Sequence, residues 1–131
     1  MNDTQPSDIV EHTSALPFDA TVERLVQTIA GRGMMIFARI DHAANARDVG
    51  MTMLPATVLI YGNATGGTPI MLATPSAALD LPLHVLVRQR EDGKAVIAYH
   101  PIATMLRRAG VPEDLVSRLG PAQEILLAAI S

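Results

Sequence analysis

Residues 61–69, YGNATGGTP, carry the residue types of a phosphate-binding loop. The segment follows an apolar run and contains Gly62, four further residues, then Gly67 and the hydroxyl of Thr68. A P-loop also needs a lysine for the outer phosphate oxygens and free backbone N–H groups at a helix N-terminus. Here Thr68 replaces the lysine, and Pro69 has no N–H to donate. The segment therefore predicts a glycine turn with a helix that is capped by Thr68 and opened by Pro69.

Weak anion binding at this turn is the functional alternative. The amides of Gly66, Gly67 and Thr68 could hold a carboxylate or a single phosphate with a few neutral hydrogen bonds, each contributing about 1 kcal/mol. No Lys or Arg lies within residues 61–69, so we expect an affinity in the millimolar range and no tight binding of nucleotides.

Asp41 and His42 form the pair with the most enzyme-like chemistry, because histidine is the usual general base near neutral pH. The alternative is structural: Asp41 caps a short helix and His42 lies in its first turn. The four histidines, His12, His42, His84 and His100, show no i, i+3 or i, i+4 spacing, and the chain has no cysteine. We therefore expect no metal site and no cofactor.

A β-hairpin is predicted around Asp92 and Gly93, a dipeptide that favours a two-residue type I′ turn. Counting outward from this turn pairs Leu86 with Tyr99 and Arg88 with Ile97. One face then carries a mixed set of residues: His84, Leu86, Arg88, Ile97 and Tyr99. The other face carries an aliphatic set: Val85, Val87, Val96 and Ala98. We expect helices to cover the aliphatic face.

The mixed hairpin face has three possible environments: solvent, a subunit interface or the wall of a shallow pocket. The interface is favoured, because Leu86, Ile97 and Tyr99 would otherwise form an exposed apolar patch. We therefore expect a homodimer that uses this face or the last helix.

The elements that position these residues follow from periodicity and from turn residues. Strands are predicted at 8–15, 34–40 and 55–62 and in the two arms of the hairpin, and the strand at 34–40 is expected to be largely buried. Helices are predicted from Asp19 to about residue 30, at 41–50, at 68–74, and in three pieces between 101 and 131. This order predicts an α+β two-layer sandwich, in which a mixed, mostly antiparallel sheet of about five strands includes the C-terminal hairpin and has helices on one face. We expect a single domain over 8–131 and a flexible N-terminus at 1–7.

Composition excludes several classes of protein. The net charge is −3 and aromatic residues make up 3% of the chain, so neither a basic patch nor a set of stacking platforms for nucleic acid is visible. No apolar run approaches the roughly 18 residues that a membrane-spanning helix needs. The first residues also lack the pattern of a signal peptide, so we expect a cytoplasmic protein.

Several segments together resemble the family known as domain of unknown function 302. These are IDHAANA, the long segment YGNATGGTPIMLATPSAALDLPLHVLVRQREDGKAVIAYHP, and the arginine and glycine at the helix end near 108–110. The residues that carry the resemblance are Asp41 and His42, Gly62 and Asn63, Gly67 to Met71, Asp80 to Pro82, and Tyr99.

The resemblance covers roughly residues 8–130 and implies an α+β fold that is often dimeric. It implies no established activity, so no catalytic residue is carried over. Some relatives have cysteines near the positions of Asn63 and Leu83, and a redox or metal role for such cysteines is not inherited here.

Two functions of different classes remain. The first is a non-catalytic, homodimeric binding or interaction module that holds a small anionic or amphipathic ligand, with a site made of Asp41, His42, Asn63, Gly66, Gly67 and Thr68. The second is a small enzyme that uses His42 or His84 as general acid or base, with the Gly66–Thr68 amides stabilising an anion. No nucleophile with a base and an orienting group is visible, so the first is favoured. A third possibility is a purely structural partner domain. Convergence of His42, Asn63 and Thr68 on one cavity would support a ligand or enzyme role, whereas a loop packed flat with no cavity would support the structural role.

Overall fold

Five β-strands form one antiparallel sheet in the computed structural model, which describes residues 8–131. The predicted flexible N-terminus, 1–7, lies outside the described residues. The strands are β1 (Val10–Thr13), β2 (Met35–Asp41), β3 (Ala56–Gly62), β4 (Leu83–Gln89) and β5 (Ala95–Tyr99). Their spatial order is β1-β5-β4-β3-β2, and each neighbouring pair is antiparallel. The expected α+β fold with a five-stranded sheet is therefore confirmed, and the sheet is wholly antiparallel in the part described.

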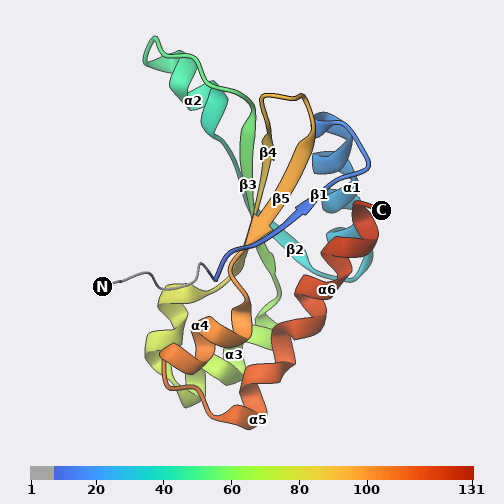
Figure 1. The fold of residues 1–131 in the computed structure, drawn as a ribbon. Coiled ribbons are helices and arrows are strands. Elements are labelled where there is room, and N and C mark those ends of the chain that lie inside the picture. The colour runs from blue at the N-terminus through green and yellow to red at the C-terminus, as the bar shows by residue number, and fades with distance from the viewer. Residues whose placement is uncertain (1–7) are drawn as a thin grey trace, which may run out of the picture.

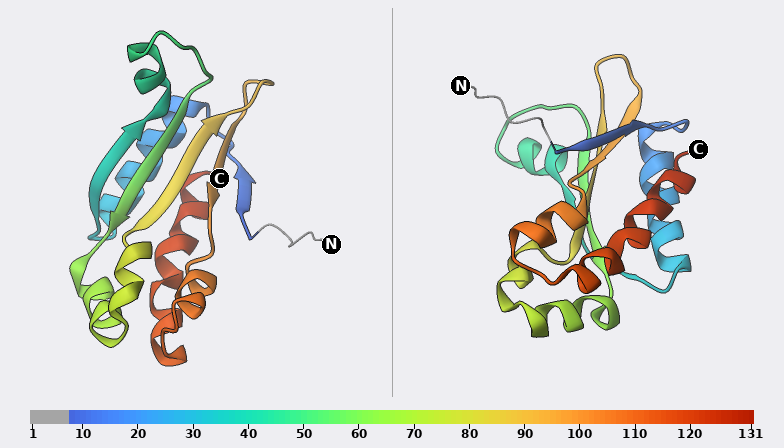
Figure 2. Two further views of the ribbon diagram at one scale, coloured as in Figure 1. Left: turned by 90° about the vertical axis from the view of Figure 1, so that its left-hand side faces the viewer. Right: turned by 60° about the horizontal axis from the view of Figure 1, so that its bottom comes forward.

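Two long helices, α1 (Phe18–Gly31) and α6 (Gly120–Ala129), lie against one face of this sheet (Figure 1). A short helix, α2 (His42–Asp48), projects at one end of the strands. The other end carries a cluster of helices: α3 (Ala64–Ala73), η1 (Pro75–Asp80), α4 (Ile102–Arg108), α5 (Glu113–Val116) and η2 (Ser117–Leu119). Figure 2, in its left-hand view, shows the opposite face of the sheet with no helix of the described residues across it.

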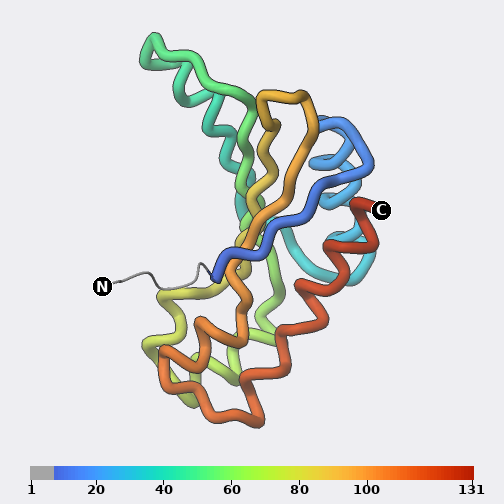
Figure 3. The backbone as a smooth tube through the Cα atoms, viewed as in Figure 1, coloured from blue at the N-terminus to red at the C-terminus, as the bar shows by residue number. Residues whose placement is uncertain are grey.

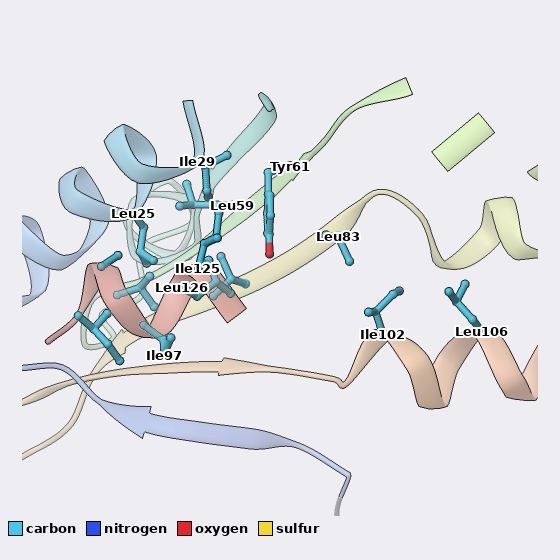
Figure 4. Packing of buried hydrophobic residues seen from close by; sticks show 14 of the residues in the cluster. Leu25, Ile29, Leu59, Tyr61, Leu83, Ile97, Ile102, Leu106, Ile125 and Leu126 are labelled. Carbon is cyan, nitrogen blue, oxygen red and sulfur yellow. The ribbon is translucent and has the colours of Figure 1, made fainter. Parts of the chain in front are cut away.

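The hydrophobic core lies between the sheet and the two long helices and continues into the helix cluster, where it includes Ile102 and Leu106 of α4 (Figure 4). Alternate residues of β3 and β4 point into it, because successive side chains of a strand face opposite sides of the sheet. On the helix side, the i, i+3, i+7 spacing of Val22, Leu25 and Ile29 places all three on one face of α1, as the periodicity predicts. The largest fully buried side chains are Tyr61, Leu25, Ile29, Leu59, Ile70, Ile97, Leu106 and Leu126.

The hairpin between β4 and β5 has a different turn from the predicted one. The N–H of Gly93 donates to the carbonyl of Arg90 over 2.9 Å, and the N–H of Arg90 donates to the carbonyl of Lys94 over 2.8 Å. Gly93 has a φ of 86°, in the left-handed region. This is the three-residue loop in which a type I turn is followed by a glycine bulge, rather than a two-residue type I′ turn.

The longer loop shifts the register by one residue, and a shift of one residue moves β5 side chains to the opposite face. Leu86 pairs with Ala98, and Arg88 pairs with Val96, so the predicted pairing of these two residues with Tyr99 and Ile97 is wrong. Ile97 is fully buried on the helix-covered side of the sheet. The prediction that His84, Leu86, Arg88, Ile97 and Tyr99 share one face is therefore corrected: the first three do, and the last two lie on the other face.

The uncovered side of the sheet, called the open face below, follows from the observed registers. It consists of Glu11, Thr13, Ala38, Ile40, Val58, Ile60, His84, Leu86, Arg88, Val96 and Ala98. Arg88 forms an ion pair across this face with Glu11 of β1, at 3.3 Å. The side chains of Ile40, Val58, Ile60 and Leu86 are only partly buried.

Two further elements differ from the predicted ones; Figure 3 shows the course of the backbone through the whole fold. The sequence predicts a largely buried strand at β2, but β2 lies at the edge of the sheet and alternates between exposed and partly buried residues. Met35 and Phe37 are 61% and 48% exposed. Helix α1 begins before Asp19, with Pro17 at the N-cap position and Asp19 in the first turn, where a negative charge is favourable.

Candidate functional site

The segment predicted as a glycine turn forms the start of α3 instead. Asn63 is the N-cap: its Oδ1 accepts a hydrogen bond of 2.6 Å from the N–H of Gly66, and its carbonyl accepts one of 3.1 Å from the N–H of Gly67. The helix thus begins at Ala64, and the prediction that Thr68 caps it is wrong. Two amides of the expected anion cradle already donate within the protein.

Gly66 also lies where a side chain would be crowded. A Cβ atom placed there would come within 3.1 Å of the Asn63 Oδ1 atom and 3.3 Å of the Leu119 side chain. Glycine at this position lets the capped first turn of α3 approach η2 closely. This contact joins two segments that are far apart in the sequence.

A cavity of about 470 Å³ opens beside this first turn. Its walls come from the end of α1, the start of β2, the end of β3, the first turns of α3, the segment 81–83, and the segment from η2 into α6. Most of the lining is apolar and includes Met34, Phe37, Met71, Leu81, Leu119 and Ile125. The polar side chains in the lining, apart from Tyr61, are Arg32, Asn63, Thr68 and Arg118.

Tyr61 contributes a fully buried ring to this cavity (Figure 4). Its hydroxyl donates a hydrogen bond of 2.8 Å to the carbonyl of Ala122, which ties β3 to the first turn of α6. Burial is the main reason why the pKa of Tyr61 is raised above its ordinary value of 10.0, and the neighbouring Tyr99 adds to the shift. The phenol therefore stays neutral at physiological pH and acts as a structural donor.

Two arginines lie at the wall of the cavity without a carboxylate partner among the described residues. Arg32 follows the end of α1, and Arg118 lies in η2; both residues are exposed. Within residues 8–131, arginine ion pairs with carboxylates are formed by Arg39, Arg88, Arg90, Arg107 and Arg108, and by neither of these two. The cavity therefore carries positive charge that the described part of the chain does not neutralise.

The sequence-predicted site divides into two groups. Asn63, Gly66, Gly67 and Thr68 all line the cavity. Asp41 and His42 do not, because Asp41 pairs with Thr57 at the other end of β3. The extended chain from Thr57 in β3 to Asn63, just after the strand, spans about 20 Å at roughly 3.3 Å per residue.

The structural interpretation of Asp41 is confirmed. Its Oδ1 accepts a hydrogen bond of 2.9 Å from the N–H of Ala44, so it caps α2. His42 is exposed in the first turn of that helix.

His84 also lies away from the cavity, on the open face. Together with Asp80, His100 and Gln123 it lines a separate hollow of about 30 Å³, large enough for about one water. Among the residues that the structure describes, no group of three or more His, Cys, Asp or Glu side chains is placed to hold a metal ion. Neither histidine of the enzyme hypothesis therefore lines the same cavity as the Gly66–Thr68 segment.

Sequence reasoning missed the two arginines and most of the apolar lining. Arg32, Met34 and Leu119 belong to segments that approach each other only when α1 and α6 pack side by side. No local pattern in the sequence distinguishes them from other surface arginines or core residues.

The comparisons with known proteins identify the family. Residues 10–131 match the domain of unknown function DUF302, and the chain belongs to this family. A crystal structure of an uncharacterised conserved protein DUF302 from Bacillus stearothermophilus has the same fold, with a TM-score of 0.80 at 15% sequence identity. The superposition covers 93% of this chain and 94% of that one.

Curated relatives include proteins named fluoride-specific ion channel FluC 1 in Brucella suis and Brucella abortus. Each is 32% identical over 88 residues, which is 67% of this chain but only 35% and 33% of those proteins. The chain thus spans about a third of the length of these relatives. Between residues 8 and 131, no helix has the length and apolar character needed to cross a bilayer.

Proposed function

We propose that this chain is a non-catalytic, cytoplasmic binding module whose ligand occupies the cavity beside the first turn of α3. The cavity itself is the observation that carries the proposal: about 470 Å³ of space with mostly apolar walls and a few polar groups. Small-molecule sites in proteins have this character and measure about 300–1,000 Å³. Asn63, Gly66, Gly67 and Thr68, predicted from the sequence as ligand-binding residues, form part of its wall.

Binding is favoured over catalysis by the chemistry of the lining. The enzyme hypothesis needs His42 or His84 next to the Gly66–Thr68 amides, and neither histidine lines this cavity. The phenol of Tyr61 is buried and donates to a backbone carbonyl. A general acid or base of suitable pKa is therefore missing from the lining residues.

A substitution that fills the cavity tests this proposal. Ala122→Leu adds a larger side chain at a lining position, and Ala128→Leu makes the same change at an exposed position of the same helix. We expect 1-octanol, a neutral apolar probe, to give saturable amide NMR shifts around residues 63–68 and 118–122. Ala122→Leu should abolish these shifts, and Ala128→Leu should leave them as they are. Shifts that do not saturate, or that survive in Ala122→Leu, would argue against a ligand cavity.

The open face supports the second part of the proposal, a homodimer. Its central residues, Ile40, Val58, Ile60 and Leu86, form a partly exposed apolar surface that no other described element covers. Apolar patches of this kind usually mark an interface. A two-fold dimer uses the same patch on both subunits, so the open faces of two copies would pack against each other.

Light scattering at micromolar concentration is expected to give the mass of a dimer. Ile60→Glu places a charge in the middle of the open face and should produce a folded monomer, which circular dichroism can verify. Leu72→Glu is the matched control, since Leu72 is 79% exposed on α3, away from the open face. A wild-type monomer at this concentration would refute the dimer.

A further inference from the structure

We infer that the ligand of the cavity is an amphipathic anion, in which an aliphatic tail carries a single anionic headgroup. This inference rests on the proposed function, because it specifies the chemistry of a ligand in the same cavity. Three features of the site support it: the apolar interior, the size of the space, and the positive charge at its wall.

The interior suits a flexible aliphatic tail. Met34 and Met71 line it together with Leu81, Leu119 and Ile125. Methionine side chains are unbranched and polarisable, so they adapt to tails of different length and shape. A fully polar ligand such as free phosphate would have to leave water for these apolar walls without new hydrogen-bond partners, which is costly.

The size of the space limits the length of the tail. With about 30 Å³ for a water-sized group, a cavity of about 470 Å³ holds about fifteen non-hydrogen atoms. Real ligands fill such sites incompletely, so a medium-chain molecule matches the space that this cavity encloses. The cavity is therefore matched to a medium-length tail.

The charge at the wall selects the headgroup. Arg32 and Arg118 line the cavity, and no Asp or Glu is among its described lining residues. This local charge is opposite in sign to the net charge of the whole chain, which is −3. A guanidinium group binds a carboxylate or a phosphate with two parallel hydrogen bonds, so each arginine suits an anionic headgroup.

Asn63 adds a neutral donor beside these charges. Its Oδ1 is engaged by the N–H of Gly66, which leaves the two N–H bonds of its side-chain amide for another acceptor. A headgroup near the first turn of α3 would also meet the favourable end of the helix dipole. The polar part of the lining thus consists mainly of donors, as an anion requires.

The test compares octanoate, 1-octanol and octylamine, which share a tail and differ in the charge of the headgroup. We expect octanoate to bind wild-type protein at least tenfold more tightly than 1-octanol, and octylamine to bind most weakly. Arg32→Gln and Arg118→Gln should each weaken octanoate about tenfold and change 1-octanol much less, since the pairing of two opposite charges exists only with octanoate. Arg47→Gln, on the distant helix α2, is the matched control and should change neither.

The outcomes distinguish a failure of the inference about the headgroup from a failure of the proposed binding function. If 1-octanol and octanoate bind equally and the arginine variants change neither, the inference about the headgroup fails while the binding cavity stands. Tightest binding of octylamine would also overturn the inference. If none of the three probes binds saturably to the wild-type protein, the proposed function itself fails. Added salt should weaken octanoate and not 1-octanol, because salt screens the attraction between charges.

Discussion

Tyr61→Ala is expected to lower the free energy of unfolding by about 3–5 kcal/mol, the usual cost of removing a large aromatic side chain from a core. Tyr61 is 0% exposed and belongs to the main hydrophobic cluster. Its removal would enlarge an existing cavity, and neighbouring side chains could not readily fill the added space. The hydrogen bond that joins β3 to α6 would be lost in the same step. Urea denaturation followed by circular dichroism measures the change.

Tyr61→Phe is the control that separates the ring from its hydroxyl. The ring remains, and only the donor to the Ala122 carbonyl is lost, so we expect a cost of about 1 kcal/mol. A loss in Tyr61→Phe as large as that in Tyr61→Ala would show that the hydroxyl, rather than the buried ring, supplies most of the stabilisation.

The stability of the protein should also fall in alkaline solution because of Tyr61. Burial raises the pKa of Tyr61 in the folded state above 10.0, so the stabilisation is fully present below pH 10.0. It is lost as the pH rises above this value, because the unfolded chain releases the proton more readily than the folded one. Tyr61→Phe has no proton to release at this position, so its stability should decline less over the same alkaline range.

Gln123→Leu is expected to cost about 2–6 kcal/mol, because it leaves two backbone groups without partners at about 1–3 kcal/mol each. The side chain of Gln123 is buried, and its Oε1 accepts a hydrogen bond of 2.9 Å from the N–H of Ile102. Its Nε2 donates one of 2.8 Å to the carbonyl of His100. The single side chain of Gln123 in α6 thus provides hydrogen-bond partners for backbone groups on both sides of Pro101, where α4 begins.

An exposed glutamine supplies the matched control for this substitution. Gln27→Leu, on the solvent side of α1, should change the stability by no more than about 0.5 kcal/mol. Thermal unfolding of both variants gives the comparison. Equal effects would mean that the two hydrogen bonds of Gln123 contribute little.

Local patterns in the sequence predicted the fold well and its register less well. The apolar spacing of α1 and the strand at β3 were clear, because periodicity reports directly which residues face a core. Asp92-Gly93 marked the hairpin correctly but fits two kinds of turn, and these differ by one residue in register. Because the predicted register was wrong by one residue, Ile97 and Tyr99 were placed on the wrong face of the sheet.

The start of α3 was ambiguous for a similar reason. Both Asn63 and Thr68 are good N-cap residues, and Pro69 favours a helix that begins just before it. The structure begins the helix at Ala64, next to the close contact between Gly66 and Leu119. A contact with a distant segment is not visible in a local pattern.

The candidate site was predicted only where it is local. Asn63, Gly66, Gly67 and Thr68 lie in one short segment, and all of them line the cavity. Arg32 and Arg118 are distant in sequence, and the packing of α1 and α6 brings their segments to one cavity. Their shared position is a property of tertiary structure.

The pairing of β1 with β5 has a consequence for how the chain is made. Strands β2 to β5 each pair with a neighbour in sequence, but β1 must wait for β5, since Val10 pairs with Tyr99. Ala15, just after β1, gains its hydrogen-bond partner later still, because its N–H donates to the carbonyl of Ile130 over 2.9 Å. During synthesis, the β2–β5 meander can therefore assemble strand by strand, while β1 emerges first and has no partner until β5 has been made.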